Sequence, residues 1–182
     1  MKTLYKTNRL ILTTLDQNYA PIVLDYLHRN KDFLKEWETE KSDNYYSLDY
    51  QRLSLRRDID NLRSEKALRL WIFKKDNTKR IIGSISIDNI IRGPFQSCFL
   101  GYKLDKDELN KGYMTEATEK MIDISFNGYG LHRIEANIMP RNLASIKVVE
   151  KLGFYNEGLA RKYLLLNGKW EDHVHMVLLN EK

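Results

Sequence analysis

The chain has 182 residues, of which 42% are hydrophobic, and this length and apolar fraction predict one domain spanning residues 1–182. Its single cysteine, Cys98, excludes an intramolecular disulfide framework and is compatible with a reducing cytosol. No apolar run approaches the length of a membrane span, and residues 1–8 lack the apolar region of a signal peptide, so we expect a cytoplasmic protein without membrane contacts.

The N-terminal quarter predicts a strand followed by helices. Residues 9–13 are expected to form the first strand. Residues 16–30 carry apolar side chains at helical spacing behind Asp16, which is a suitable N-cap. Residues 33–37 are expected to form a second, short helix.

A third helix is predicted over residues 48–66. The net charge of +5 raises the question of a nucleic-acid partner. Basic and acidic side chains alternate along this helix, however, which is typical of a solvated face, so we expect no nucleic-acid binding. The polar segment 39–47 before the helix is the candidate for a mobile substrate loop.

Strands dominate the middle of the chain. Residues 68–75 and 80–91 predict two strands joined by the turn residues Asp76-Asn77-Thr78. Residues 97–104 predict a further strand, and an amphipathic helix is expected over residues 114–126.

The C-terminal third returns to strands. Residues 131–139 alternate apolar and polar side chains, which is the pattern of a half-buried strand. Asn142 can cap a short helix. The last two strands, residues 154–166 and 169–179, flank Asn167-Gly168, a strong type I′ hairpin signal. The whole pattern predicts an α+β fold with a mostly antiparallel sheet and helices packed on its faces.

The turn between the strand ending at Leu104 and the helix beginning near Met114 has the features of an anion site. The first N–H groups of a helix lack intrahelical partners, and the helix dipole adds partial positive charge there. Gly112 permits a positive φ and close backbone approach, and Lys111 would add a full charge beside the turn.

Several segments stand in an order that resembles the GNAT superfamily of N-acetyltransferases, in the branch containing the ribosomal-protein alanine N-acetyltransferases. The strongest part lies between Cys98 and Gly158. The resemblance rests on these stretches: Cys98-Phe99-Leu100-Gly101-Tyr102, residues 110–117, residues 126–136, Asn142-Leu143-Ala144-Ser145, and Glu150-Lys151-Leu152-Gly153-Phe154 with Glu157-Gly158.

The resemblance implies a mixed, mostly antiparallel sheet of about seven strands, with a splay between the fourth and fifth. It also implies acetyl-coenzyme A as the acetyl donor. The pyrophosphate is expected on the turn and the pantetheine arm along the strand ending at Leu104. The implied cofactor contacts are Leu104, Asn110, Lys111, Gly112, Tyr113, Met114, Thr115, Asn142 and Ser145. The outer positions of the family's turn motif are Leu109 and Met114 here, so only Gly112 matches that motif.

Acetyl transfer to an amine needs an oxyanion donor, a proton for the departing thiolate and a neutral amine. A backbone N–H near Leu104 is the expected oxyanion donor. The resemblance aligns Val149 with the position where many relatives have a tyrosine acid, so Ser145, one turn earlier, becomes the candidate acid. A cofactor contact without proton transfer is an equal alternative for Ser145.

The general base is not identified by the resemblance. Some relatives have a glutamate where this chain has Phe99, and the remaining carboxylates that could act through water are Glu36, Glu38, Glu135, Glu150 and Asp172. An α-amine with a pKa near 8 is about one-tenth neutral at pH 7, whereas a lysine amine is far less so. A site without a strong base therefore favours an N-terminal α-amine as acceptor.

The acceptor wall is assigned to residues around the polar loop and in the closing hairpin: Trp37, Tyr45, Tyr46 and Asp172. A small-molecule amine is the alternative acceptor, because Glu38, Glu40 and Asp43 add acid there. A catalytically silent module that binds acyl-coenzyme A is a second alternative. A homodimer is compatible with the sequence, and no metal is expected because His173 and His175 lack a third ligand at suitable spacing.

Overall fold

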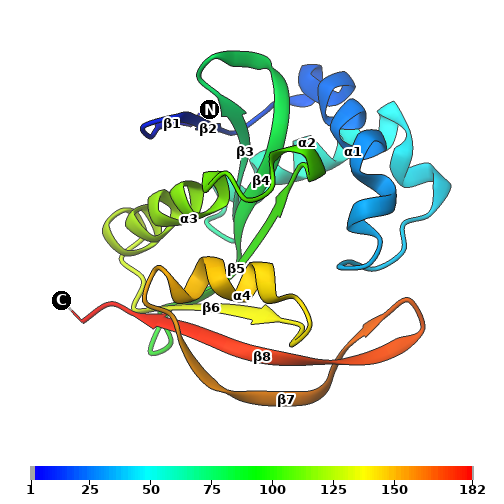
Figure 1. Cartoon of the computed structure of the whole chain (residues 1–182). Coiled ribbons are helices and arrows are strands. Elements are labelled where there is room, and N and C mark those ends of the chain that lie inside the picture. The colour runs from blue at the N-terminus through cyan, green and yellow to red at the C-terminus, as the bar shows by residue number, and fades with distance from the viewer. Residues whose placement is uncertain (1–2, 182) are drawn as a thin grey trace.

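The computed structural model describes residues 3–181, which form one eight-stranded sheet with helices on both faces (Figure 1). The strands are β1 (Leu4–Lys6), β2 (Leu10–Thr13), β3 (Leu68–Lys74), β4 (Asn77–Ile91), β5 (Ser97–Leu104), β6 (Arg133–Ile138), β7 (Tyr155–Leu166) and β8 (Lys169–Leu179). The helices are α1 (Ala20–Leu34), α2 (Leu48–Arg63), α3 (Tyr113–Asp123) and α4 (Leu143–Glu150). Three short 3₁₀ turns, Gln17–Tyr19, Asp43–Tyr46 and Lys106–Glu108, and a π-helical turn, Ile124–Gly128, complete the described elements.

The spatial order of the strands is β1-β2-β3-β4-β5-β6-β8-β7, and every neighbouring pair is antiparallel except β5 and β6. The predicted mostly antiparallel α+β fold is confirmed. One strand more than expected is present, because β1 adds a three-residue edge strand beside β2. None of the helices in residues 3–181 is long and apolar enough to cross a membrane.

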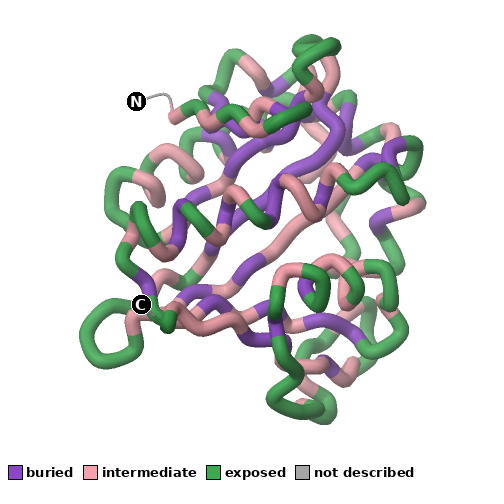
Figure 2. Tube along the Cα trace, turned by 60° about the vertical axis from the view of Figure 1, so that its left-hand side comes forward, coloured by how far each residue is buried: buried purple, intermediate pink, exposed green. Residues whose placement is uncertain are grey.

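The two faces of the sheet are covered by different helices. One face carries a large apolar cluster that includes Met114 and Met121 of α3 and Val149 of α4. The other face packs Trp71 and Phe73 of β3 against α1 and α2 in a second cluster. Figure 2 shows the buried residues concentrated along the central strands, with exposed residues along the outer loops and hairpins. Burial of these two faces is the main source of stability, because apolar area removed from water contributes roughly 25 cal/mol per Å².

The sheet opens between its two parallel strands. Residues Ser97–Phe99 of β5 pair with Arg133–Glu135 of β6, and no further pair follows. Beyond this point β5 stays paired with β4 as far as Leu104, and β6 stays paired with β8 as far as Ile138. This is the predicted splay between the fourth and fifth expected strands, and it divides the sheet at the level of the α3 N-terminus.

The expected break between two helices at residues 31–32 is wrong. A single helix, α1, continues through Leu34, and residues 35–37 form only a turn. Asn30 sits in its interior, fully buried, with Nδ2 donating to the Tyr26 carbonyl at 2.9 Å and Oδ1 accepting from the Lys106 backbone at 2.9 Å. A residue that sequence patterns associate with helix ends is here satisfied by tertiary contacts.

Candidate active site

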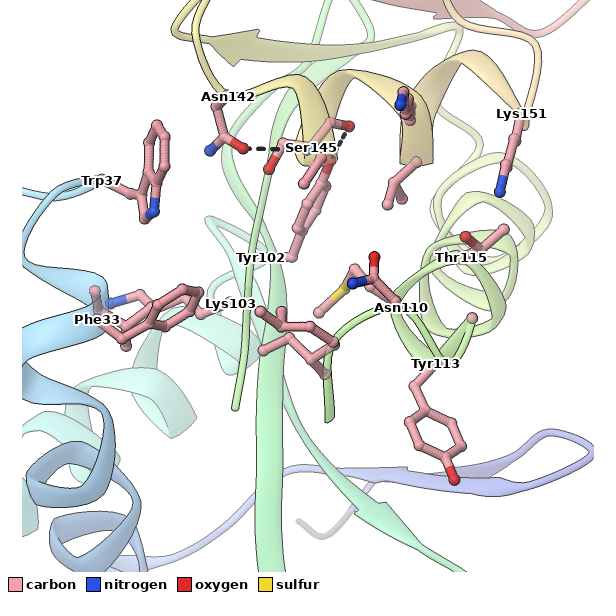
Figure 3. Close-up of a pocket in the computed structure, with 18 of the residues that line it drawn as sticks. Phe33, Trp37, Tyr102, Lys103, Asn110, Tyr113, Thr115, Asn142, Ser145 and Lys151 are labelled. Atoms are coloured by element: carbon pink, nitrogen blue, oxygen red, sulfur yellow. Dashed lines mark hydrogen bonds between the residues drawn. The ribbon is translucent and has the colours of Figure 1, made fainter. Parts of the chain in front are cut away.

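The larger of two neighbouring cavities, about 480 Å³, lies on the α3/α4 face of the sheet, beside the splay (Figure 3). Its walls come from the end of β5, the first turn of α3 and one side of α4. Eight of the nine predicted cofactor residues line it: Leu104, Asn110, Gly112, Tyr113, Met114, Thr115, Asn142 and Ser145. The structure therefore assembles predicted residues from three separate segments around one hollow.

The first turn of α3 presents unpaired backbone donors to this cavity. Gly112 is the N-cap, with φ +76°, and no side chain caps the helix. The first backbone N–H with an intrahelical bond is that of Glu116, which donates to the Gly112 carbonyl at 3.1 Å. The N–H groups of residues 113–115 thus remain available to a bound anion, as expected for an uncapped helix start.

Lys111 is the predicted cofactor residue that does not line the cavity. Its ammonium group bonds the Asp107 carbonyl at 2.6 Å and the Glu108 carboxylate at 2.9 Å. Burial alone would raise the pKa of Glu108, but Lys111 and Lys74 hold it below its ordinary value. Lys111 therefore stabilises the turn by linking it to Asp107 and Glu108 instead of contacting the cavity.

Positive charge at the cavity comes instead from α4. Lys147 and Lys151 both line the cavity, and neither has an ion-pair partner among residues 3–181. In Figure 3 the side chain of Lys151 points from α4 toward Thr115 at the start of α3. The spacing of Ala144, Lys147, Val148 and Lys151 places them on one helix face, so helical periodicity could have found these lysines.

Thr7 and Arg9, just before β2, bind the turn and the first turn of α3. Arg9 donates from Nη1 to the Lys111 carbonyl at 2.9 Å and from Nε to the Glu116 carboxylate at 2.7 Å, and its guanidinium lies 4.6 Å from the Tyr113 ring centroid. Burial alone would raise the pKa of Glu116, but hydrogen bonds from Thr7 and Arg9 hold it below its ordinary value. The β1–β2 edge thereby fixes the orientation of the first turn of α3.

The edge of β5 that faces the splay also offers free backbone groups. The Asp105 N–H donates to the Ile82 carbonyl of the neighbouring strand at 2.7 Å. Because successive residues of a strand point their N–H groups to opposite edges, the Leu104 N–H points away from β4 and into the opening. This geometry fits an extended ligand that pairs with β5 as another strand would.

Asn142, Ser145 and Tyr102 contact one another beside the splay. The Asn142 side chain caps α4 by accepting from the Ser145 N–H at 3.1 Å, as predicted, and the Tyr102 hydroxyl donates to the Ser145 carbonyl at 2.9 Å (Figure 3). Burial raises the pKa of Tyr102 well above its ordinary value, and hydrogen bonding with Ser145 offsets only part of this effect. Val149 is fully buried in the core. Sequence reasoning did not select Tyr102, although it is a polar aromatic residue two positions before Leu104.

A second cavity, about 330 Å³, lies on the opposite face of the sheet. Its lining includes polar residues of β3 and β4, namely Arg69, Ser84, Ser86 and Asp88. It also includes Asn137 of β6, Met139 just after β6 and His173 of β8. Five residues border both cavities: Trp37, Tyr102, Lys103, Asn142 and Ser145. The two cavities therefore meet at the splay, one on each face of the sheet.

The segment after α1, residues 35–40, contacts the residues at this junction. Glu38 forms an ion pair with Lys103, whose pKa is lowered by burial, with Glu38 offsetting part of the effect. Asn167, at the tip of the β7–β8 hairpin, donates to the Lys35 carbonyl at 3.1 Å and accepts from the Glu40 N–H at 2.6 Å. These hydrogen bonds hold the loop after α1 and the tip of the β7–β8 hairpin together.

Three residues predicted for the acceptor wall lie elsewhere, whereas Trp37 lines both cavities. Tyr45 and Tyr46 pack in the apolar cluster beneath α1, with ring centroids 5.2 Å apart. Asp172 accepts from the Lys162 N–H at 2.8 Å within the β7–β8 hairpin. The contribution of these three residues to acceptor binding stays a prediction.

The family model and the similar proteins found by comparison all point to one family. Residues 9–155 match the family model of the acetyltransferase (GNAT) domain. The chain is 40% identical to the probable N-acetyltransferase YjcK of Bacillus subtilis over 98% of this chain and 95% of that protein. It is 36% identical to the [ribosomal protein uS5]-alanine N-acetyltransferase of Escherichia coli over 92% and 86% of the two chains. A solved structure of Mycobacterium smegmatis RimJ in complex with CoA-disulfide has a TM-score of 0.91 at 23% identity, covering 100% of this chain and 88% of that one.

The features of the site lie inside the matched residues 9–155. They are the end of the β5–β6 pairing, the uncapped turn before α3 and the Asn142 cap of α4. The chain belongs to the GNAT acetyltransferase family and is an N-acetyltransferase of the branch that contains the ribosomal-protein alanine N-acetyltransferases.

Proposed function

We propose that this protein transfers the acetyl group of acetyl-coenzyme A to the α-amine of a protein or peptide N-terminus, by direct attack in a ternary complex. The observation that carries the proposal is the meeting of two cavities at the splay, one on each face of the sheet. A donor and an acceptor that enter from opposite faces can bind together without a covalent enzyme intermediate.

The donor fits the larger cavity by its chemistry. Its pyrophosphate matches the N–H groups of residues 113–115, with Lys147 and Lys151 opposite them. Its pantetheine amides match the exposed edge of β5. Bound acetyl-coenzyme A supplies an acetyl thioester, and the solved RimJ complex supports this choice of donor.

The chain's own groups then have separate tasks. The Leu104 N–H points into the splay and can stabilise an oxyanion. Ser145 borders both cavities and is the proposed donor of a proton to the thiolate, with Tyr102 beside it as a positioning group. Because a thiol has a pKa of about 8.5, the leaving group needs only modest help near neutral pH.

The acceptor class is supported by the second cavity and by the relative that acts on ribosomal protein uS5 alanine. An α-amine with a pKa near 8 is about one-tenth neutral at pH 7, so it needs less deprotonation than a lysine side chain. A small-molecule amine is the second candidate, because Glu38 and Asp88 border the junction or the second cavity and would suit a cationic molecule.

A peptide panel tests the proposal. The protein is incubated with acetyl-coenzyme A and each of four acceptors: a peptide beginning with alanine, the same peptide with a blocked N-terminus and an internal lysine, spermidine, and no acceptor. We expect thiol release and a mass gain of one acetyl group only with the free alanine N-terminus. Turnover of spermidine alone would favour the small-molecule acceptor, and no amine-dependent thiol release would indicate a silent binding module.

A further inference from the structure

The second cavity contains a buried histidine that has no assigned role. His173 of β8 is only 3% exposed, and its side chain lines this cavity. It lies on the sheet face opposite the apolar cluster that holds Met176 of the same strand. A histidine so placed belongs neither to the core nor to the solvated surface.

The hydrogen bonding of His173 defines its tautomer. Nδ1 lies 3.1 Å from the Glu171 carbonyl oxygen. Since a carbonyl oxygen can only accept, Nδ1 carries the hydrogen of this bond. In the neutral ring Nε2 is then an acceptor, and the hydrogen bond of His173 to the described residues 3–181 is made by Nδ1, not by Nε2.

The surroundings lower the pKa of His173 and so favour the neutral ring. Burial is the largest cause that lowers the pKa of His173, and electrostatic interactions with His175 and Arg141 act in the same direction. The hydrogen bond to the Glu171 backbone and the charge of the Glu171 carboxylate oppose part of this effect, and that carboxylate pairs with Arg141 at 2.7 Å. From β7 the Tyr163 ring packs against it at 5.5 Å between centroids, and the charged residues Arg69, Asp88 and Lys103 line the same cavity.

The carboxylates near the cavity are already occupied. Glu38 pairs with Lys103, and Asp88 accepts from the Ser86 hydroxyl at 2.6 Å. Glu135, a further candidate base, bonds Arg133 at 2.8 Å and lies 3.1 Å from His175. Nε2 of His173 is therefore a proton acceptor in a buried ring that is not engaged by a neighbouring residue among those described.

From this geometry we propose that His173 is the general base that takes the proton from the acceptor ammonium group. The proposal rests on the proposed amine acetylation. One N–H bond of the ammonium breaks and its proton goes to Nε2, which releases it to solvent after turnover. The amine lone pair then forms the new C–N bond as the C–S bond breaks. The remaining surplus proton on nitrogen ends on the sulfur, so the products are the N-acetylated acceptor and the free thiol.

The variant His173→Asn tests this role. Its amide nitrogen can still donate to the Glu171 carbonyl, but no basic atom remains at the position of Nε2. His132→Asn is the matched control, because His132 is exposed and lines neither cavity. We expect kcat/KM for the acceptor to fall at pH 7 by about 100-fold or more, within the usual range for a lost general base. The affinity for coenzyme A and the melting temperature should stay close to those of the control.

The pH profile separates base catalysis from a structural effect. Without the base, the rate follows the neutral fraction of the amine and rises about tenfold per pH unit until the amine pKa near 8. The wild-type rate levels off earlier, above the pKa of His173, so the gap between the two proteins should shrink as pH rises. A gap that stays constant at every pH, or an H173N enzyme as active as wild type, would overturn the proposal.

A measurement independent of turnover checks the protonation state. Nitrogen-15 NMR of the histidine rings in the coenzyme A-bound protein should show His173 protonated on Nδ1 alone at pH 7. A ring protonated on both nitrogens at that pH would overturn the proposal. If wild type acetylates no amine at all, the proposed function itself falls; an active wild type with an equally active His173→Asn variant defeats only the role of His173.

Discussion

Removing the α4 lysines should weaken donor binding without altering the acetyl-transfer chemistry. Lys147 and Lys151 line the larger cavity without ion-pair partners among the described residues, so their charges are free to meet phosphate groups. Both side chains belong to exposed positions, where a unit-charge pair at 4 Å contributes about 1 kcal/mol in water. Each lysine-to-glutamine change should therefore raise the Kd for coenzyme A about fivefold, and the double variant should raise it about 30-fold.

Isothermal titration with coenzyme A at two salt concentrations measures this effect. Lys66→Gln is the control, because it makes the same charge change at an exposed site that lines neither cavity. A truncated donor, the acetyl thioester of N-acetylcysteamine, has no phosphate and should be used equally well by the wild type and the double variant. The reasoning is refuted if the double variant binds coenzyme A like the control, or if it loses as much activity with the truncated donor.

Three further changes test other parts of the site. Gly112→Ala forces a non-glycine residue to φ +76°, with its Cβ 3.4 Å from Arg9 Nη2. Urea unfolding should show that the free energy of unfolding falls by about 1–2 kcal/mol, and titration should show a weaker affinity for coenzyme A. Unchanged stability would contradict the assignment of a strained turn. Glu116→Gln removes a carboxylate whose pKa is lowered in the folded state. Its stabilising effect is therefore present above the unfolded pKa of about 4.3 and is lost as pH falls through the folded pKa. Urea unfolding should show the wild type more stable than the variant at pH 6–8, with the difference in unfolding free energy closing below about pH 4; a difference that widens on acidification would oppose this. Asn167→Ala breaks the contacts between the hairpin tip and the loop after α1, so kinetics should show a higher KM for the acceptor with an unchanged Kd for coenzyme A. Asn77→Ala, at the start of β4, is the control and should change neither.

Local signals in the sequence predicted the parts of the fold that depend on neighbours along the chain. Asn142 was expected to cap α4, and its side chain does bond the Ser145 N–H three residues on. The turn Asn167-Gly168 was expected to join the last two strands, and both residues have positive φ there. Such features depend on a few adjacent residues, so sequence alone carries them.

Features that depend on distant contacts were harder to predict. Asn30 looked like a helix end, but contacts to Tyr26 and Lys106 satisfy it inside α1. Lys111 looked like a phosphate contact, yet the folded turn brings its ammonium group to Glu108. The second cavity is harder still to predict, because it joins residues of β3 and β4 to residues of β6 and β8 across the splay.

The central claim is that the unpaired N–H groups at the start of α3 and on the edge of β5 hold the donor. A backbone amide NMR titration with coenzyme A tests it most directly. We expect the largest shift changes at residues 113–115 and at Leu104, with smaller changes along α4. Changes centred elsewhere, with these amides unmoved at saturation, would contradict it.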